Sequence, residues 1–182
     1  DSITNIGAVS RDVVVTTGTD LIFLDDSGVR SLLRTIQEKS APIGDISRNV
    51  NQDLKARLAN ETGTIKAHYN VEQAFILLTF PSQNLVYCFD TRFPLEDGSL
   101  RSTTWTGLVP SAMCRTEDGL LMFGTENGIS EYIGYTDLNE SFVLEYFSHP
   151  LTFGDSSRLK ILKKVNLTTE GGQGENAVLN WG

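Results

Sequence analysis

One apolar hairpin pattern occurs twice in this sequence and restricts the folds that are open to the chain. Residues 20–32 consist of an apolar run, a polar turn that ends in Gly28, and a second run with apolar and polar residues in alternation. Residues 119–132 repeat this pattern around Gly128, and residues 84–90 begin a looser copy. Short apolar runs joined by glycine turns predict β-hairpins. Their repetition favours an all-β fold whose sheets surround an axis, as the blades of a β-propeller do.

The chain predicts three antiparallel β-meanders, each a candidate propeller blade. The segments expected as strands are 13–17, 21–24 and 29–34 in the first meander; 65–69, 74–80, 85–90 and a strand ending at Trp105 in the second; and 112–114, 120–123, 129–133 and 142–147 in the third. The segment 74–80 is apolar at nearly every position. A strand of that composition is expected to be buried on both faces.

One segment between the first two meanders has the spacing of a helix. Its apolar residues recur every fourth position, at Ile46, Val50, Leu54 and Leu58. This period predicts a helix over about 45–59, with Asp45 or Ser47 as the residue that caps its start. Because the apolar stripe is narrow, we expect a surface helix that lies on the sheets as an insertion.

The character of the sequence changes after a Gly-Asp-Ser-Ser break near residue 155. Residues 159–167 form a basic segment with apolar residues in alternation, which predicts a strand. We therefore expect a partial propeller over 1–154 and the start of a second β domain over 155–182, incomplete in this chain. The sequence begins with Asp1 and no initiating methionine, so we expect an excerpt of a longer protein.

Composition and charge limit the class of protein. Hydrophobic residues make up 40% of the 182 residues, which is typical of a folded globular chain. No run approaches the roughly 18 apolar residues that a membrane-spanning helix needs. The net charge of −8 disfavours tight binding to nucleic acid, since that requires clustered Lys and Arg against the phosphates. Transient contact with DNA that slides past the protein is compatible with this charge.

The histidines and cysteines suggest no catalytic or metal centre. His68 and His149 are the only histidines, and neither has nearby residues that would complete a metal site or a catalytic group. Cys88 and Cys114 are the only cysteines, and apolar neighbours favour small buried thiols for both. We expect structural roles for all four residues.

Three glycine-containing segments resemble ligand loops but fit turns better. Residues 25–28 and 96–99 place carboxylates beside a glycine, yet they lack the ligand spacing of a calcium loop. Aspartate and glycine at these positions are what a tight turn requires. Residues 171–174 are too short for a phosphate-binding loop and favour a hairpin tip. We therefore expect no catalytic residue, no bound cofactor and no metal.

Two further classes of function remain open from the residues alone. A carbohydrate-active propeller enzyme would use carboxylates near the loops, and the sequence offers Asp90, Asp97, Glu117 and Glu126. A receptor-binding or glycan-binding module would use exposed aromatic platforms, for which Trp105 and Tyr132 are the candidates.

Several segments together resemble a family of phage proteins. The segments that carry the resemblance, in chain order, are 10–14, 23–32, 45–50, 67–69, 85–90, the Trp105 strand and 121–129. Their succession resembles the tail nozzle or DNA-stabilisation proteins of short-tailed bacteriophages, and it covers most of residues 5–154. Three meanders cannot close a propeller, since four or more blades are typical.

The resemblance implies a non-enzymatic structural protein. It implies a β-propeller that is built into a homo-oligomeric ring below the portal, extends the tail tube and helps to retain the packaged genome. The expected partners are further copies of the chain, the portal or head-tail adaptor, other tail proteins and, transiently, genomic DNA in the lumen. The expected location is the virion tail, after synthesis in the bacterial cytoplasm. A negatively charged lumen would let DNA slide through without sticking.

Overall fold

The computed structural model describes residues 6–38, 46–133 and 142–147, with Ile161, Lys164 and Val178. Its contacts group Asp1–Tyr132 as one compact unit and Ile133–Gly182 as another. All strands and helices of the described residues belong to the first unit. The domain boundary expected near residue 155, the strand expected at 159–167 and the glycine loop at 171–174 fall almost entirely outside the described residues, so they stay predictions.

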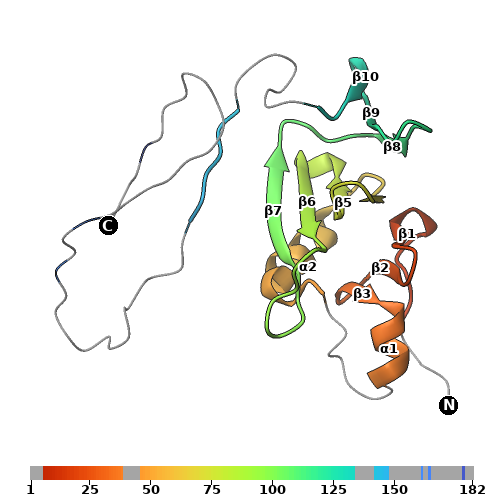
Figure 1. Cartoon of the computed structure of the whole chain (residues 1–182), viewed down its shortest axis with the longest axis vertical. Coiled ribbons are helices and arrows are strands. Elements are labelled where there is room, and N and C mark those ends of the chain that lie inside the picture. The colour runs from red at the N-terminus through yellow and green to blue at the C-terminus, as the bar shows by residue number, and fades with distance from the viewer. Residues whose placement is uncertain are drawn as a thin grey trace. The chain divides into compact units, whose positions relative to one another are not determined.

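The strands of the first unit form three antiparallel sheets, termed A, B and C here (Figure 1). Sheet A contains β1 (Val14–Thr16), β2 (Leu21–Asp25) and β3 (Gly28–Ser31); sheet B contains β4 (Lys66–Asn70), β5 (Phe75–Phe80), β6 (Leu85–Asp90) and β7 (Arg101–Thr106); sheet C contains β8 (Ala112–Arg115), β9 (Leu121–Thr125) and β10 (Gly128–Glu131). Within each sheet, consecutive strands are neighbours. The three predicted meanders are confirmed for their strands up to residue 133. Among the described residues the sheets do not close into a propeller.

Sheet B has an apolar layer on each of its faces. Every residue of β5 is buried, as the uninterrupted apolar run predicts. Because side chains alternate along a strand, Ile76 and Leu78 pack toward residues of sheet A, and Leu77 packs toward residues of sheet C. We term these two contacts the AB layer and the BC layer. Sheet B is thus stacked between two other sheets.

The predicted surface helix lies over the AB layer. A 3₁₀ turn (η2, Arg48–Val50) leads into α2 (Asn51–Asn60), whose Leu54 is buried in that layer. The α-helix begins later than the predicted start near residue 45. The Ser47 hydroxyl does not cap the helix; it accepts a hydrogen bond from the backbone N–H of Val29 at 2.9 Å. This contact ties the chain before α2 to sheet A.

A second helix corrects the prediction that the first meander extends as a strand to residue 34. Strand β3 ends at Ser31, and α1 (Leu32–Glu38) follows directly. The Ser31 hydroxyl accepts from the backbone N–H of Arg34 at 3.0 Å, and an Asp20 oxygen accepts from that of Leu33 at 3.0 Å. These side chains satisfy amide groups that the first turn of a helix leaves unpaired. Short 3₁₀ turns also occur at η1 (Arg11–Val13) and η3 (Pro81–Gln83).

The prediction of a strand at residues 142–147 is wrong. These residues are described without a strand assignment, and the side chains of Val143 and Phe147 are 84% and 86% exposed. An apolar run forms a strand only where a neighbouring strand supplies hydrogen bonds, and sequence pattern alone does not identify that neighbour.

None of the described helices has the length and apolar character needed to span a bilayer.

Candidate functional site

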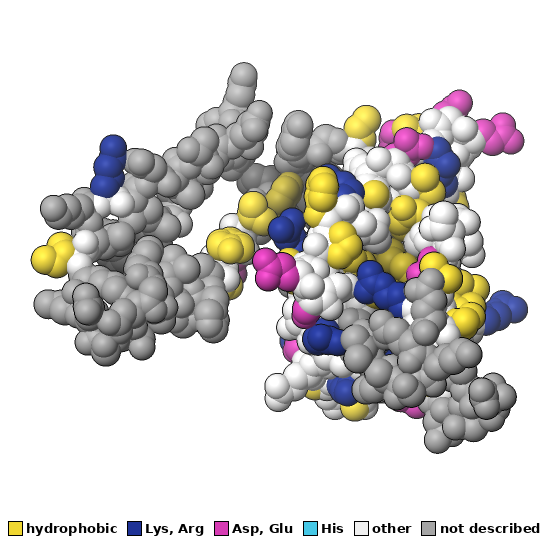
Figure 2. Space-filling view, turned by 60° about the horizontal axis from the view of Figure 1, so that its bottom comes forward, with side chains coloured by type: hydrophobic (Ala, Val, Ile, Leu, Met, Phe, Trp, Pro, Cys, Tyr) yellow, Lys and Arg dark blue, Asp and Glu magenta, His cyan; other side chains and the backbone are white. Residues whose placement is uncertain are grey.

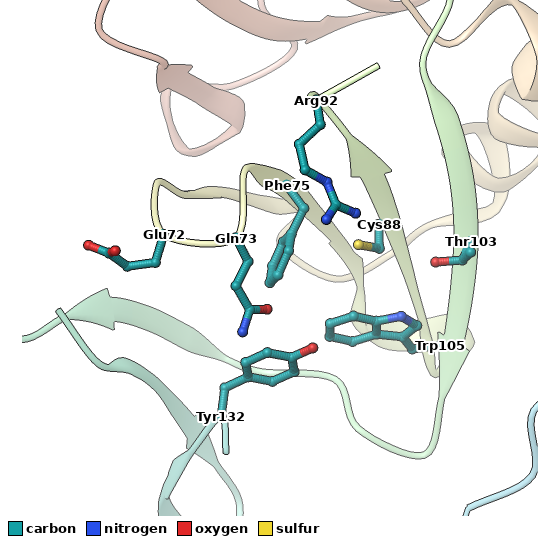
Figure 3. Close-up of a pocket in the computed structure, with 8 residues that line it drawn as sticks. All are labelled: Glu72, Gln73, Phe75, Cys88, Arg92, Thr103, Trp105 and Tyr132. Atoms are coloured by element: carbon teal, nitrogen blue, oxygen red, sulfur yellow. The ribbon is translucent and has the colours of Figure 1, made fainter. Parts of the chain in front are cut away.

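An open pocket of about 380 Å³ lies beside the sheet C face of sheet B (Figure 3). The residues that line it are Glu72, Gln73, Phe75, Cys88, Arg92, Thr103, Trp105 and Tyr132. They come from the turn between β4 and β5, from β5, β6 and β7, from the loop after β6, and from the position directly after β10. The pocket combines an aromatic wall with several polar groups.

Strand register brings the sheet B residues of the pocket to one face. Cys88 on β6 lies opposite Thr103 on β7, so the two side chains project to the same side. Trp105 is two residues beyond Thr103 and therefore shares this side. Phe75 belongs to the BC layer, as Cys88 and Trp105 do, which places all four residues on the same face.

Tyr132 completes the aromatic wall from sheet C. Its backbone N–H donates to the carbonyl of Leu121 at 2.8 Å, which fixes the chain just after β10. Its ring centroid lies 5.8 Å from that of Phe75 and 5.9 Å from those of Trp105 and Phe123. Burial raises the pKa of Tyr132, so its phenol stays protonated and can donate a hydrogen bond. The expected pair of aromatic platforms, Trp105 and Tyr132, is brought together in one wall.

Ion pairs engage the charged groups at the pocket rim. Arg92 donates to both oxygens of Asp90, at 2.9 and 2.7 Å, and these hydrogen bonds lower the pKa of that carboxyl. Glu72 pairs with Arg115 of β8 through one carboxylate oxygen. Each charge at the rim therefore has an opposite partner, and the pocket is close to neutral.

The two cysteines differ in their environments. Cys88 is partly buried against the BC layer, and burial raises the pKa of its thiol to about 11, although a hydrogen bond with Thr103 acts in the opposite direction. Cys114 is exposed, so the prediction of a buried thiol is wrong there. The reason is strand alternation: Cys114 lies opposite Met122 in the register, on the face of sheet C that points away from the BC layer.

We expect one thiol of the native chain to react quickly with Ellman's reagent at pH 8. A thiol with a pKa near 11 is ionised to only about one part in a thousand at that pH, and the thiolate is the reactive form. Cys88 should therefore react much more slowly than Cys114, and both should react quickly in urea. The control is Cys114→Ser, which should remove the fast phase; a fast phase that persists in this variant would contradict the assignment.

His68 is the histidine that the structure describes, and its surroundings can be compared with those of a metal site. His68 lies on β4, where burial lowers the pKa of its imidazole, and its Nε2 atom is buried with no hydrogen-bond partner among the described residues. His149 lies outside the described residues. Within the described ranges, no group of three or more histidine, cysteine or carboxylate side chains is arranged to hold a metal ion.

The two candidate calcium segments are turns. The Asp25 carboxylate accepts from the backbone N–H groups of Ser27 and Gly28, at 2.7 and 3.0 Å, and pairs with Arg30 at 2.8 Å. In the loop 91–100, hydrogen bonds from the hydroxyl and N–H of Ser99 lower the pKa of Asp97. Each of these carboxylates stabilises the turn in which it lies, as the residue types predict.

The four carboxylates considered for an enzyme lie at separate places. Asp90 ends β6, Asp97 follows in the next loop, Glu117 lies in the turn after β8, and Glu126 lies in the turn after β9. Sequence reasoning instead missed Gln73, Phe75 and Arg92, whose only signal is their position next to strand ends.

No family model, no curated protein and no solved structure matches this chain. Its own geometry therefore carries the functional argument. A pocket with an aromatic wall, a protonated phenol and an amide can hold a small ligand by ring contact and hydrogen bonds.

Proposed function

We propose that this chain is a structural protein of a short-tailed bacteriophage, part of the tail nozzle or tube below the portal. The observation that supports this proposal most is the stack of three sheets, in which the central strand β5 of sheet B is buried on both faces. Consecutive antiparallel sheets packed face to face are the arrangement of neighbouring propeller blades. In this account the chain performs no catalysis; it retains packaged DNA and forms part of the ejection channel.

The exposed face of sheet C is where the stack would continue. The side chains of Leu121 and Phe123 point into the BC layer, so position 124 faces the opposite side of the sheet. Ile129 is the cross-strand partner of Gly124, and its side chain therefore points to that opposite side. The Ile129 side chain is 79% exposed there. We propose that this face packs against a sheet of a neighbouring copy, as a ring of subunits requires.

The charge of the chain fits a channel that DNA passes through. A net charge of −8 repels phosphates and disfavours tight binding to the genome. Figure 2 shows basic and acidic side chains scattered over the visible face instead of a continuous basic patch. Such a surface supports sliding contact with DNA.

The test is the mass of the full-length chain in solution, measured by light scattering. We expect a homo-oligomer for the wild-type chain and a monomer for Ile129→Glu, because a buried carboxylate at the contact would be costly. Val71→Glu is the matched control, since Val71 is 55% exposed in a turn of sheet B and should leave the oligomer intact. A wild-type monomer, or an oligomer that Ile129→Glu does not change, would count against the proposal.

A further inference from the structure

The aromatic wall of the pocket has partly uncovered ring faces. The rings of Trp105 and Tyr132 are within 5° of parallel, with centroids 5.9 Å apart. Parallel rings in contact lie only about 3.5 Å apart from plane to plane. The rings must therefore be displaced sideways, so each covers only part of the other. Phe75 meets both rings edge to face, at interplanar angles of 72° and 74°, and supports the wall from β5.

The pocket also holds hydrogen-bonding groups that the fold does not use. The Gln73 side chain makes no hydrogen bond within the described part of the chain, and Figure 3 shows its amide directed toward Tyr132. An amide both donates and accepts. Glu72 bonds Arg115 through Oε1 alone, which leaves Oε2 able to accept. These groups lie beside the aromatic wall, close enough to the same cavity to meet one ligand.

We propose that this pocket binds a pyranose ring of a neutral saccharide. A pyranose has an apolar C–H face, which would lie on the uncovered part of the Trp105 ring beside Tyr132, and equatorial hydroxyls, which would reach Gln73 and Glu72. A cavity of about 380 Å³ lies within the range of small-molecule sites. This inference goes beyond the structural role, which uses none of these groups.

The charges of the pocket argue against two other ligand classes. A nucleotide could stack on the aromatic wall, but Arg92, the one cation of the lining, is already bonded to both oxygens of Asp90 and so is not a free partner for a phosphate. A quaternary ammonium group also favours aromatic walls, but Glu72, the one carboxylate of the lining, is already paired with Arg115 and so is not a free counter-charge. A neutral ligand needs no opposite charge in the pocket.

The test is saturation-transfer difference NMR on the full chain. The probes are maltose, cellobiose and N,N′-diacetylchitobiose, with deoxyadenosine monophosphate and choline as comparison ligands. We expect transfer to the ring C–H protons of at least one disaccharide, with a dissociation constant of about 0.1–1 mM, as for a small ligand in an open site. Tighter binding of soluble starch than of maltose would indicate an internal unit of a polymer; equal binding would indicate a free sugar.

Two variants locate the binding at the pocket. Gln73→Ala removes the amide from an exposed turn and should weaken saccharide binding about fivefold, by the loss of a hydrogen bond. Gln52→Ala is the matched control, because Gln52 is exposed on α2, which packs on the AB layer away from the pocket. Trp105→Ala should weaken binding about tenfold or more, but Trp105 also packs in the BC layer, so Gln73→Ala decides if that variant does not fold.

Three results would overturn the proposal. The first is no transfer to any of the disaccharides at millimolar concentration. The second is a Gln73→Ala variant that binds as the wild-type chain does. The third is tighter binding of the nucleotide or of choline than of every saccharide.

Discussion

Replacing Arg30 with alanine is expected to lower the free energy of unfolding by about 3–5 kcal/mol. Arg30 donates to Asp25 at 2.8 Å, and the two side chains are only 8% and 7% exposed. Removal of the guanidinium would leave the Asp25 carboxylate buried without its charge partner, which is the costly state of a buried ion pair. The same carboxylate holds the turn between β2 and β3, so the loss should weaken sheet A as a whole.

Urea unfolding followed by circular dichroism measures this effect. Arg11→Ala is the matched control, because Arg11 pairs with Asp12 at the surface with its side chain 95% exposed. An exposed pair contributes only about 0–1 kcal/mol, so the control should unfold close to the wild-type midpoint. Equal midpoints for Arg30→Ala and Arg11→Ala would show that the Asp25–Arg30 pair is not buried as described.

Replacing either of two neighbouring leucines of β5 with alanine is expected to lower the free energy of unfolding by about 2–5 kcal/mol. Leu77 is 0% exposed and packs in the BC layer, whereas Leu78 is 2% exposed and packs in the AB layer. In a sheet with one solvent-facing side, only one of two adjacent residues would be costly to truncate. A large loss of stability at both positions would indicate a sheet that is stacked between two others.

The same urea experiment compares Leu77→Ala and Leu78→Ala with Leu33→Ala. Leu33 lies on α1 with 46% exposure, so its truncation removes the same atoms with little loss of packing. We expect that variant to stay within about 0.5 kcal/mol of the wild-type chain. A small effect at either β5 position would mean that one face of sheet B is not covered.

Local patterns in the sequence predicted the sheets but not how each segment ends. The apolar run of β5 and the glycine turns around Gly28 and Gly128 predict the three meanders, because burial and turn geometry act over a few residues. Helix α1 was missed because its leucines continue the apolar pattern of β3. Ser31, which precedes it and bonds the N–H of Arg34, was the signal for a helix start.

The pocket could not be assembled from sequence because its members meet only through stacking of the sheets. Trp105 and Tyr132 were predicted as exposed aromatic platforms, but their contact depends on the packing of sheet C against sheet B. Gln73 lies in a turn, where a glutamine is an ordinary residue and gives no signal of a binding site. The register of β6 and β7 places Cys88 opposite Thr103, and the sequence alone does not give this register.

The most direct test of the proposed function is to image the full-length chain mixed with the portal ring of the phage to which the proposal assigns it. The proposal predicts a ring of copies that docks on the portal along the same axis, with a continuous central channel. Electron microscopy would show such an assembly as end-on rings and as stacked side views. A chain that stays separate from the portal, with no ring in either view, would contradict the proposal of a tail nozzle.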